Sequence, residues 1–496
     1  MSETTAQAIA LIIYFVAMII IGLWGYQRTD DLDDYMLAGR NLPPAVAALS
    51  AGASDMSGWL LLGLPGAIYA KGLVEFWIAI GLTIGAYLNW VFIAPRLRTY
   101  TEVSRNSITV PSFLDNRLRD TSRLLRIACG VIIFTFFTFY VSSGMVAGGK
   151  FFDSSFGMEY HVGMTLVAGI VVLYTLVGGF LAVSWTDAVQ GTMMLAALVM
   201  IPIVAIAEFA GGTGDLFAKA AEVNPNIYSF FAGTTVLAVI SNLAWGLGYF
   251  GQPHIIVRFM ALRGPKDAKA GRRIGIGWML LSVIGTALVA IVGVGYFGGR
   301  GEDLADPETV FIALGKVLFH PLISGFLLAA VLAAIMSTIS SQLLVTSSAL
   351  VEDIYRIFSK APDRLTEKRM VLYGRVAVLA VAVLAAILAW NPDASILKLV
   401  SFAWAGFGGS FGPVIVLSLF WRKLTSQGAL AGLLTGAITV VVWGKLLHGG
   451  IFDLYEILPA FLLATIVAVV VSNATYKHDP EIDAEFDEAA RLAKAG

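Results

Sequence analysis

Residues 6–26 contain no charged side chain. In a helix that rises about 1.5 Å per residue, a run of this length can cross a hydrocarbon core about 30 Å thick. Similar runs recur along the chain, and charged residues make up only 14% of it, against about 25% in soluble domains. A membrane β-barrel would need short alternating segments, whereas these runs are continuously apolar. The sequence therefore predicts an all-α polytopic membrane protein.

The apolar runs, separated by charge clusters and by glycine or proline, predict thirteen spanning helices. They lie near residues 6–26, 45–70, 73–95, 127–149, 160–181, 188–211, 232–257, 274–297, 321–350, 371–390, 396–420, 427–447 and 452–473. If the amino terminus is outside, most of the 33 Lys and Arg residues fall in inward loops such as 96–126 and 258–273. The positive-inside rule therefore predicts an outer amino terminus and a cytoplasmic carboxyl tail.

Several classes of function are disfavoured by what the sequence contains. The net charge of −1 gives no reason to expect a nucleic-acid partner. The five histidines lie far apart, and no phosphate-binding loop of the GxxxxGK[ST] kind is present, so a histidine metal centre and coupling to ATP are not expected. The short polar tail leaves no room for a fused kinase, and we expect no enzyme and no obligate protein partner.

Two sets of five helices suggest an internal repeat, at residues 45–211 and 232–420. An odd number of spans gives the second set the opposite orientation to the first. The expected organisation is a first helix and cytoplasmic loop (1–44), the two repeats joined by an outer loop (212–231), two peripheral helices (421–473) and a cytoplasmic tail (474–496). The outer loops 212–231 and 298–320 could hold short helices, and the second could act as a lid.

Each repeat opens with a helix interrupted by small residues, AGASDMSGWLLLGLPG at 51–66 and SNLAWGLGYFGQP at 241–253. Interruptions at matching positions of two halves point to the binding site of a transporter. Unwound backbone at 52–58 exposes carbonyls that can bind a hard cation and amides that can bind a carboxylate. Asp55 adds a charge that costs several kcal/mol at this depth unless it meets a cation, a partner or water. The alternative is an aspartate bonded only to backbone amides at the break.

The ninth helix carries Ala334, Ser337 and Thr338 at positions i, i+3 and i+4, on one helical face. One carbonyl and two hydroxyls then point to the same place. Together with the carbonyls of Ala53 and Met56, they would provide five oxygen ligands for Na⁺. The alternative is that both hydroxyls bond to carbonyls of their own helix.

Aromatic residues lie near both interruptions. Trp245, Tyr249 and Pro253 are spaced by four, which predicts one helical face, and Tyr140 and Trp59 could complete a pocket for a compact apolar ring. Simple packing is the alternative for each of them. Asp187 is expected at the inward junction of the fifth and sixth helices, as an interface charge or as part of an ion path.

Five stretches carry a resemblance to a known family: DYMLAGRNL, SAGASDMSGWLLLGLPG, YTLVGGFLAVSWTDAVQG, AWGLGYFGQPHIIVRFM and LAAIMSTISSQLLV. The chain resembles the sodium:solute symporter family, and the second and fourth stretches resemble its proline-transporting members most. The resemblance implies a leucine-transporter-type fold with a 5+5 inverted repeat and broken helices. It also implies Na⁺ as the coupling ion, L-proline as the substrate and the bacterial cytoplasmic membrane as the location.

Site residues follow from the same resemblance. It implies Na⁺ ligands at Ala53, Met56, Ala334, Ser337 and Thr338, with Asp55 and Ser57 close by. It implies substrate contacts from Ser57, Gly58, Trp59, Tyr140, Trp245, Tyr249 and Pro253. Asp55, Asp187 and Arg40 would act in coupling or gating. The expected function is sodium-coupled uptake of proline by alternating access; the alternatives are symport of another solute, such as pantothenate, a carboxylate or a sugar, and a membrane sensor that does not transport.

Overall fold

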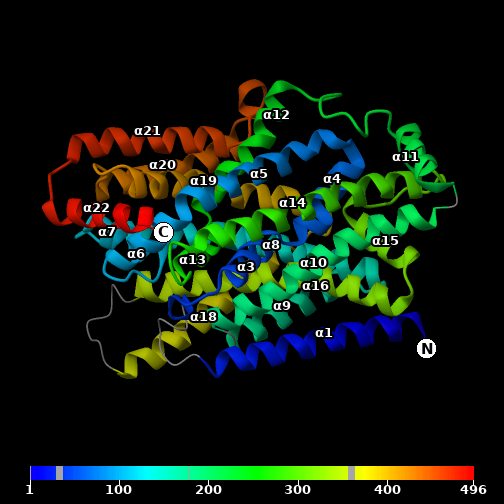
Figure 1. The fold of residues 1–496 in the computed structure, drawn as a ribbon, viewed down its shortest axis with the longest axis horizontal. Coiled ribbons are helices and arrows are strands. Elements are labelled where there is room, and N and C mark those ends of the chain that lie inside the picture. The colour runs from blue at the N-terminus through cyan, green and yellow to red at the C-terminus, as the bar shows by residue number, and fades with distance from the viewer. Residues whose placement is uncertain (1, 29–36, 178, 210, 356–363, 496) are drawn as a thin grey trace.

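The computed structural model describes residues 2–28, 37–177, 179–209, 211–355 and 364–495 as a bundle of long helices running in roughly the same direction (Figure 1). By length and composition, the described residues form nine candidate membrane spans, or ten when one bent helix pair is counted as a span. Eight of them contain α1 (Glu3–Tyr26), α8 (Leu124–Phe156), α10 (Phe180–Glu208), α14 (Asp267–Gly293), α16 (Pro321–Ser348), α19 (Ile396–Phe420), α20 (Ser426–Leu446) and α21 (Ile457–Thr475). The predicted all-α membrane fold is confirmed.

The ninth span, Leu73–Val103, consists of the 3₁₀ turn η3 (Leu73–Phe76), α5 (Trp77–Leu88), a π-helical turn η4 (Asn89–Ile93) and α6 (Ala94–Val103). Three further predicted helices appear as shorter apolar helices within α9 (Tyr160–Val177), α12 with the segment after it, and α18 (Arg364–Leu388). Each predicted span thus has a helical counterpart.

The bent pair is the first interrupted helix. α3 (Pro44–Asp55) begins at a proline, which has no amide hydrogen to leave unsatisfied at a first helical turn, and ends in the small-residue segment. A π-helical turn (Trp59–Gly63) leads into α4 (Leu64–Lys71), and the two parts meet at 62°. The predicted interruption is confirmed, and it exposes backbone groups inside the bundle.

The second interrupted helix has a different local geometry. α12 (Val236–Leu243) continues into the 3₁₀ helix η5 (Ala244–Gly251), and α13 (Pro253–Met260) begins after an extended Gln252. Proline cannot donate the backbone hydrogen bond that an uninterrupted helix would require, so Pro253 starts a new helix.

Glycines bring α5 and η5 into direct backbone contact. A Cβ atom added to Gly85 would collide with the carbonyl of Gly246, and one added to Gly81 would collide with the carbonyl of Leu243. Small residues at such positions allow membrane helices to approach closely. The backbone of η5 therefore lies directly against α5.

The loops predicted at 212–231 and 298–320 hold α11 (Gly212–Val223) and α15 (Val310–Leu318), so the short helices expected there are confirmed. Just before α15, Asp306 and Glu308 form ion pairs of 2.8 and 2.7 Å with Lys150 of α8. These contacts fasten the segment to the bundle, and its action as a lid stays a prediction.

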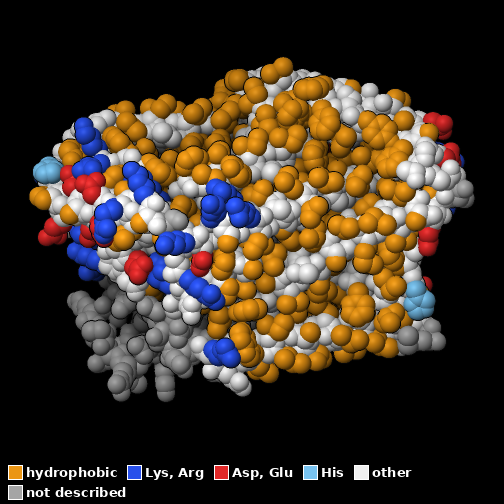
Figure 2. All heavy atoms as spheres, in the orientation of Figure 1, with side chains coloured by type: hydrophobic (Ala, Val, Ile, Leu, Met, Phe, Trp, Pro, Cys, Tyr) orange, Lys and Arg blue, Asp and Glu red, His pale blue; other side chains and the backbone are white. Residues whose placement is uncertain are grey.

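Two helices at the opposite end, α7 (Val110–Leu118) and α22 (Pro480–Ala495), were not predicted. Figure 2 shows Lys and Arg side chains gathered at this end, beside a wide band of hydrophobic side chains, and Figure 1 places the two termini at opposite ends of the bundle. The basic end is the one that the positive-inside rule assigns to the cytoplasm.

The predicted start of the sixth spanning helix, near residue 188, was wrong. α10 begins at Phe180, not near residue 188, so Asp187 lies within a helix and is completely buried. The hydroxyls of Ser184 and Thr186 bond to carbonyls of their own helix, so these buried polar groups are satisfied within α10. Gly178, in the stretch YTLVGGFLAVSWTDAVQG, lies outside the described residues.

Candidate transport site

The centre of the bundle holds a cluster of oxygen atoms from α3 and α16. The Ser337 hydroxyl donates to the carbonyls of Ala53 at 2.9 Å and Ala334 at 3.2 Å. The Thr338 hydroxyl lies 3.4 and 3.2 Å from the same two carbonyls. Four of the five predicted Na⁺ ligands thus converge, and Ser337 and Thr338 bond both across the helix interface and to their own helix.

Met56, the fifth predicted ligand, is at the break itself. Its backbone leaves helical geometry (φ −77°, ψ 69°) as the first residue after α3. Hydroxyl and carbonyl oxygens suit a hard monovalent cation, because they carry partial negative charge without a formal charge to neutralise. The donor types of this set therefore fit Na⁺, which these residues would hold with their oxygen atoms.

Asp55 is the hub of a second set of contacts. Its backbone carbonyl accepts from the Ser57 amide at 2.9 Å, the Trp59 indole at 3.1 Å and the Tyr140 hydroxyl at 3.3 Å. One carboxylate oxygen accepts from the Tyr249 hydroxyl. The other carboxylate oxygen is buried without a partner among the described residues. Four predicted substrate residues thus surround the aspartate, which is 1% exposed.

Ser57 and Gly58 form the tip of the break. The Ser57 hydroxyl accepts weakly from the Trp59 amide at 3.4 Å. A Cβ added to Gly58 would lie 2.8 Å from the Cβ of Ala147 on α8. Only glycine therefore lets the break approach α8 this closely without a shift.

A cavity of about 20 Å³ adjoins Asp55, Met56 and Tyr249 and extends to Asn89 and Trp278. This is about the space for one water molecule. Asn89 donates to the Tyr249 carbonyl at 3.0 Å, and so holds the 3₁₀ segment beside the cavity. The site is closed around a polar core in this conformation.

The prediction that Trp245, Tyr249 and Pro253 share one helical face is wrong. A 3₁₀ helix has three residues per turn, so residues four apart point in different directions, and the break at Gln252 turns the chain again. Trp245 faces Trp404 and Tyr455, with ring centroids 6.4 and 5.3 Å away. Tyr249 faces Asp55, as described above.

Pro253 lines a different cavity, of about 30 Å³, together with Thr109, Phe180 and Ser348. The structure therefore brings Tyr249, Tyr140, Trp59 and Ser57 together. Trp245 is linked to that group through Trp404, whose ring lies 5.1 Å from the Tyr249 ring, whereas Pro253 lines the second cavity.

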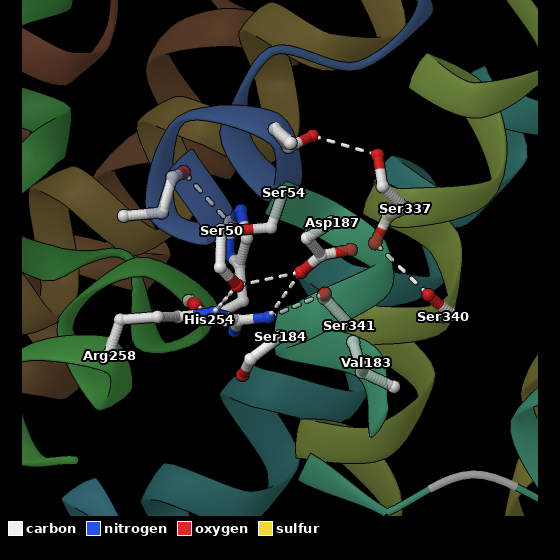
Figure 3. Close-up of polar contacts among 12 residues, drawn as sticks. Ser50, Ser54, Val183, Ser184, Asp187, His254, Arg258, Ser337, Ser340 and Ser341 are labelled. Atoms are coloured by element: carbon white, nitrogen blue, oxygen red, sulfur yellow. Dashed lines mark hydrogen bonds and ion pairs between the residues drawn. The ribbon is translucent and has the colours of Figure 1, made fainter. Parts of the chain in front are cut away.

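A buried ion pair joins α10 to α13 (Figure 3). Arg258 lies 3.1 Å from a carboxylate oxygen of Asp187, and the two residues are 1% and 0% exposed. The Ser50 hydroxyl donates to the same oxygen at 2.8 Å, and Arg258 donates to the Ser341 hydroxyl at 2.7 Å. The guanidinium also lies 5.1 Å from the centre of the Phe180 ring. Residues of α3, α10, α13 and α16 are therefore tied together by one charged network.

Arg258 was not predicted as a site residue, because it was counted among the basic residues of an inward loop. A sequence signal was nevertheless available: the residue interrupts the apolar stretch HIIVRFM. A charge within such a stretch marks a buried partner or a functional site.

Arg40, predicted to act in coupling or gating, bonds to several elements at the basic end of the bundle. It donates to the Met260 carbonyl at 2.9 Å, to the Ser107 carbonyl at 2.7 Å and to Thr101 at 3.0 Å. Arg98 donates to the Arg263 carbonyl at 3.1 Å and to the Leu262 carbonyl. Together the two arginines bond to carbonyls at the carboxyl end of α13 and just beyond it.

The whole arrangement suits binding rather than covalent chemistry. The described residues contain no group of three or more His, Cys, Asp or Glu side chains that could hold a metal ion. The oxygen cluster lies beside a break in a helix, in a bundle whose other broken helix contributes Tyr249. An alkali cation and a small organic molecule are ligands that such a site can hold together.

Known proteins agree with this description. Three bacterial relatives are similar over nearly their whole length. The high-affinity proline transporter PutP of Bacillus subtilis is 56% identical over 472 residues, 95% of this chain and 98% of the relative. The osmoregulated proline transporter OpuE of the same organism is 53% identical over 467 residues, 94% of each chain. Sodium/proline symporter 2 of Staphylococcus saprophyticus is 49% identical over 493 residues, 98% of this chain and 96% of the relative.

Two solved structures share the fold at low sequence identity. A Na⁺-coupled sialic acid symporter in a substrate-bound outward-open state superposes with a TM-score of 0.80 at 19% identity, covering 96% of this chain and 99% of that chain. Mhp1, a nucleobase-cation-symport-1 family transporter, gives 0.56 at 13% identity, covering 93% and 100%. The predicted leucine-transporter-type fold is confirmed.

The sodium:solute symporter family matches residues 35–436, a range that includes both broken helices, the oxygen cluster and the Asp187–Arg258 pair. This match covers far more than half of the chain, and the relatives extend it over almost the entire length. The chain therefore belongs to the sodium:solute symporter family.

Proposed function

We propose that the protein is a symporter that couples the inward movement of Na⁺ to the uptake of L-proline across the bacterial cytoplasmic membrane. The observation that carries the proposal is the oxygen cluster of α3 and α16 beside the contacts around Asp55. The substrate comes from the named activity of the relatives, which are proline transporters at 53–56% identity over about 95% of the chain. Na⁺ is carried with proline, so it is a second substrate and not a resident cofactor.

The proposed Na⁺ site consists of Ala53, Met56, Ala334, Ser337 and Thr338. An ion there would replace the hydrogen bonds that Ser337 and Thr338 now make to the Ala53 carbonyl. The ion would also fix the distance between α3 and α16. Proline would bind beside it, against Ser57, Gly58, Trp59, Tyr140 and Tyr249, because these residues surround the same break.

Trp245 and Pro253 are retained in the proposed substrate site with changed roles. Trp245 would contact proline from the side of α19, where its ring lies against Trp404. Pro253 would act indirectly, because it fixes where α13 begins. Asp187 and Arg40 remain proposed coupling or gating residues, now with Arg258 as the direct partner of Asp187.

Coupling follows from linkage. Each ligand that favours the same arrangement of α3, α13 and α16 raises the affinity of the other ligand by the same factor. The membrane potential adds about 2.3 kcal/mol per charge per 100 mV to the Na⁺ gradient and drives net uptake. Alternating access would expose the site first to the outside and then to the cytoplasm, with an outer amino terminus, a cytoplasmic tail and inverted repeats at 45–211 and 232–420.

Uptake of radiolabelled proline into proteoliposomes of the purified protein tests the proposal. We expect accumulation with an inward Na⁺ gradient and none with an equal K⁺ gradient. Folded protein without Na⁺-dependent proline uptake would contradict the proposal. The same vesicles would then be tested with pantothenate, carboxylates and sugars, and accumulation of none of them would favour a sensor.

A further inference from the structure

The tail helix α22 packs against α6 at the inner end of the bundle (Figure 1) and contacts Arg117 at the end of α7. The Ala489 carbonyl accepts from the Thr99 hydroxyl of α6 at 3.1 Å, and Ala489 is completely buried. The sequence of the helix, PEIDAEFDEAARLAKA, is strongly acidic in its first half. An acidic helix is therefore seated on the most basic part of the protein.

Phe486 is the centre of this contact. Three guanidinium groups surround its ring, with the ring centre 5.3 Å from Arg96, 5.5 Å from Arg117 and 5.4 Å from Arg422. Tyr100 meets the ring edge-on at 6.1 Å. Cations within about 6 Å of an aromatic ring are attracted by its face, so one side chain holds three arginines that would otherwise repel one another.

Acidic residues form the rim around Phe486. Glu485 forms a 2.6 Å ion pair with Arg119. Asp487 forms a 2.5 Å pair with Arg422, and Asp483 lies 3.7 Å from the same arginine. These rim pairs are partly exposed, so salt in the surrounding water screens them.

The arginines around Phe486 come from three different elements. Arg96 belongs to α6, Arg117 to α7, and Arg422 to the segment after α19. Arg117 also lies 3.4 Å from the Ser418 carbonyl and 3.5 Å from the Arg422 carbonyl, at the end of α19. Arg96 also lies 4.9 Å from the ring of Phe420, the last residue of α19, so docked α22 reinforces a direct contact between the inner ends of α6 and α19.

The segment η4–α6 and the helix α19 also contact the broken segment η5, nearer the centre of the bundle. Asn89, in the turn that leads into α6, donates to the Tyr249 carbonyl at 3.0 Å. Trp404 of α19 donates to the Trp245 carbonyl at 2.7 Å, and Gln252 donates to the Trp404 carbonyl at 3.1 Å. A change in the separation of α6 and α19 would therefore displace η5.

We propose that α22 is an electrostatic latch that holds the inner side of the transporter closed by joining α6, α7 and α19. Release of α22 lets these inner ends separate and speeds the release of substrate to the cytoplasm. The effect on transport rests on the proposed function, whereas the docking equilibrium of α22 does not. Weakening the rim pairs or raising the salt concentration on the inner side shifts the equilibrium towards release.

The docking equilibrium can be measured without transport. Cys129, the only cysteine in the sequence, is buried, so Ala489→Cys provides a probe that reacts with a maleimide only when α22 lifts away. We expect the double variant Glu485→Gln/Asp487→Asn to raise the labelling rate about fivefold, the effect of losing two partly exposed pairs. We expect salt to raise the rate in the parent and much less in the double variant. A labelling rate that changes neither with the double substitution nor with the salt concentration would contradict the proposed latch.

Transport is then compared in the same variants without the added cysteine. We expect faster efflux of preloaded proline in Glu485→Gln/Asp487→Asn and in Phe486→Ala, with unchanged Na⁺ activation. Glu488→Gln is the matched control, because Glu488 pairs with Arg491 of its own helix at 2.6 Å. Faster labelling with unchanged proline efflux would show that release of α22 does not control transport. Absence of proline transport in the parent would instead reject the proposed function and leave the labelling result standing.

Discussion

The Tyr249 hydroxyl donates a hydrogen bond to the Asp55 carboxylate, and so joins the two interrupted helices at the centre of the bundle. Both side chains are buried, at 4% and 1% exposed. The other Asp55 oxygen has no partner among the described residues, which leaves this hydroxyl as the group that holds the carboxylate in place. A second link between the two interrupted helices joins Arg258 of α13 to the Ser50 hydroxyl of α3 at 3.1 Å, so the Tyr249–Asp55 bond is the link nearest the break.

Tyr249→Phe removes that bond and leaves a buried carboxylate unsatisfied. A hydrogen bond to a charged group contributes about 1.5–3 kcal/mol, so we expect proline affinity to fall by about tenfold or more. Tyr160→Phe is a matched control, because its hydroxyl donates to the Ala389 carbonyl at 2.7 Å, in another part of the bundle. Equilibrium binding of labelled proline to both variants measures the difference. Equal affinities would show that the Tyr249 hydroxyl does not contribute to proline binding.

Ser337→Ala removes one oxygen from the proposed Na⁺ site and one bond across the α3–α16 interface. We expect a weaker Na⁺ dependence of proline binding, by about tenfold, with near-normal amounts of folded protein. Thr346→Ala provides the control, since Thr346 bonds to the Gln342 carbonyl of the same helix at 2.7 Å. Titration of proline binding with NaCl at constant ionic strength measures both. An unchanged Na⁺ response would remove Ser337 from the ligand set.

Asp187 and Arg258 should depend on each other for stability. Removing one member of a buried pair leaves an uncompensated charge, which costs about 3–5 kcal/mol. We expect Arg258→Gln and Asp187→Asn each to lower the thermal unfolding temperature clearly. The double variant should recover part of the loss, because no charge is then left alone. Additive losses in the double variant would argue against direct coupling of the two charges.

Gly58→Ala should displace the break from α8, because the new Cβ would lie 2.8 Å from the Cβ of Ala147. We expect a large loss of proline uptake with a modest loss of stability. The double variant Gly58→Ala/Ala147→Gly removes the opposing methyl group and should restore uptake in part. Failure of this rescue, with folded protein, would indicate that Gly58 is needed for its backbone conformation or for direct contact with the substrate.

The long helices could be predicted because lipid requires continuous apolar runs with internally bonded backbone, and that requirement is visible residue by residue. The Ser337 and Thr338 contacts could also be predicted, since spacing within one helix determines which groups share a face. In contrast, α7 and α22 are short and polar, and contacts with other elements stabilise them. Nothing in their local sequence has the signature of a span.

The remaining errors have tertiary causes. Asp187 and Arg258 lie 71 positions apart, and no local pattern indicates that α10 and α13 bring them together. η5 is a 3₁₀ helix, and its backbone packs directly against α5. The spacing of Trp245, Tyr249 and Pro253 was interpreted with the period of an α-helix, which does not apply there. Local pattern predicts which residues point the same way only when the type of helix is known.

The glycine contact between α5 and η5 restricts how the protein can move. No side chain separates the two backbones at Gly85 and Gly246, so there is no deformable layer along which one could slide past the other. Asn89 fastens the same pair through the Tyr249 carbonyl. The two segments must therefore travel as a single mechanical part during each cycle. The surface at which moving and stationary halves shear against each other has to lie elsewhere in the bundle.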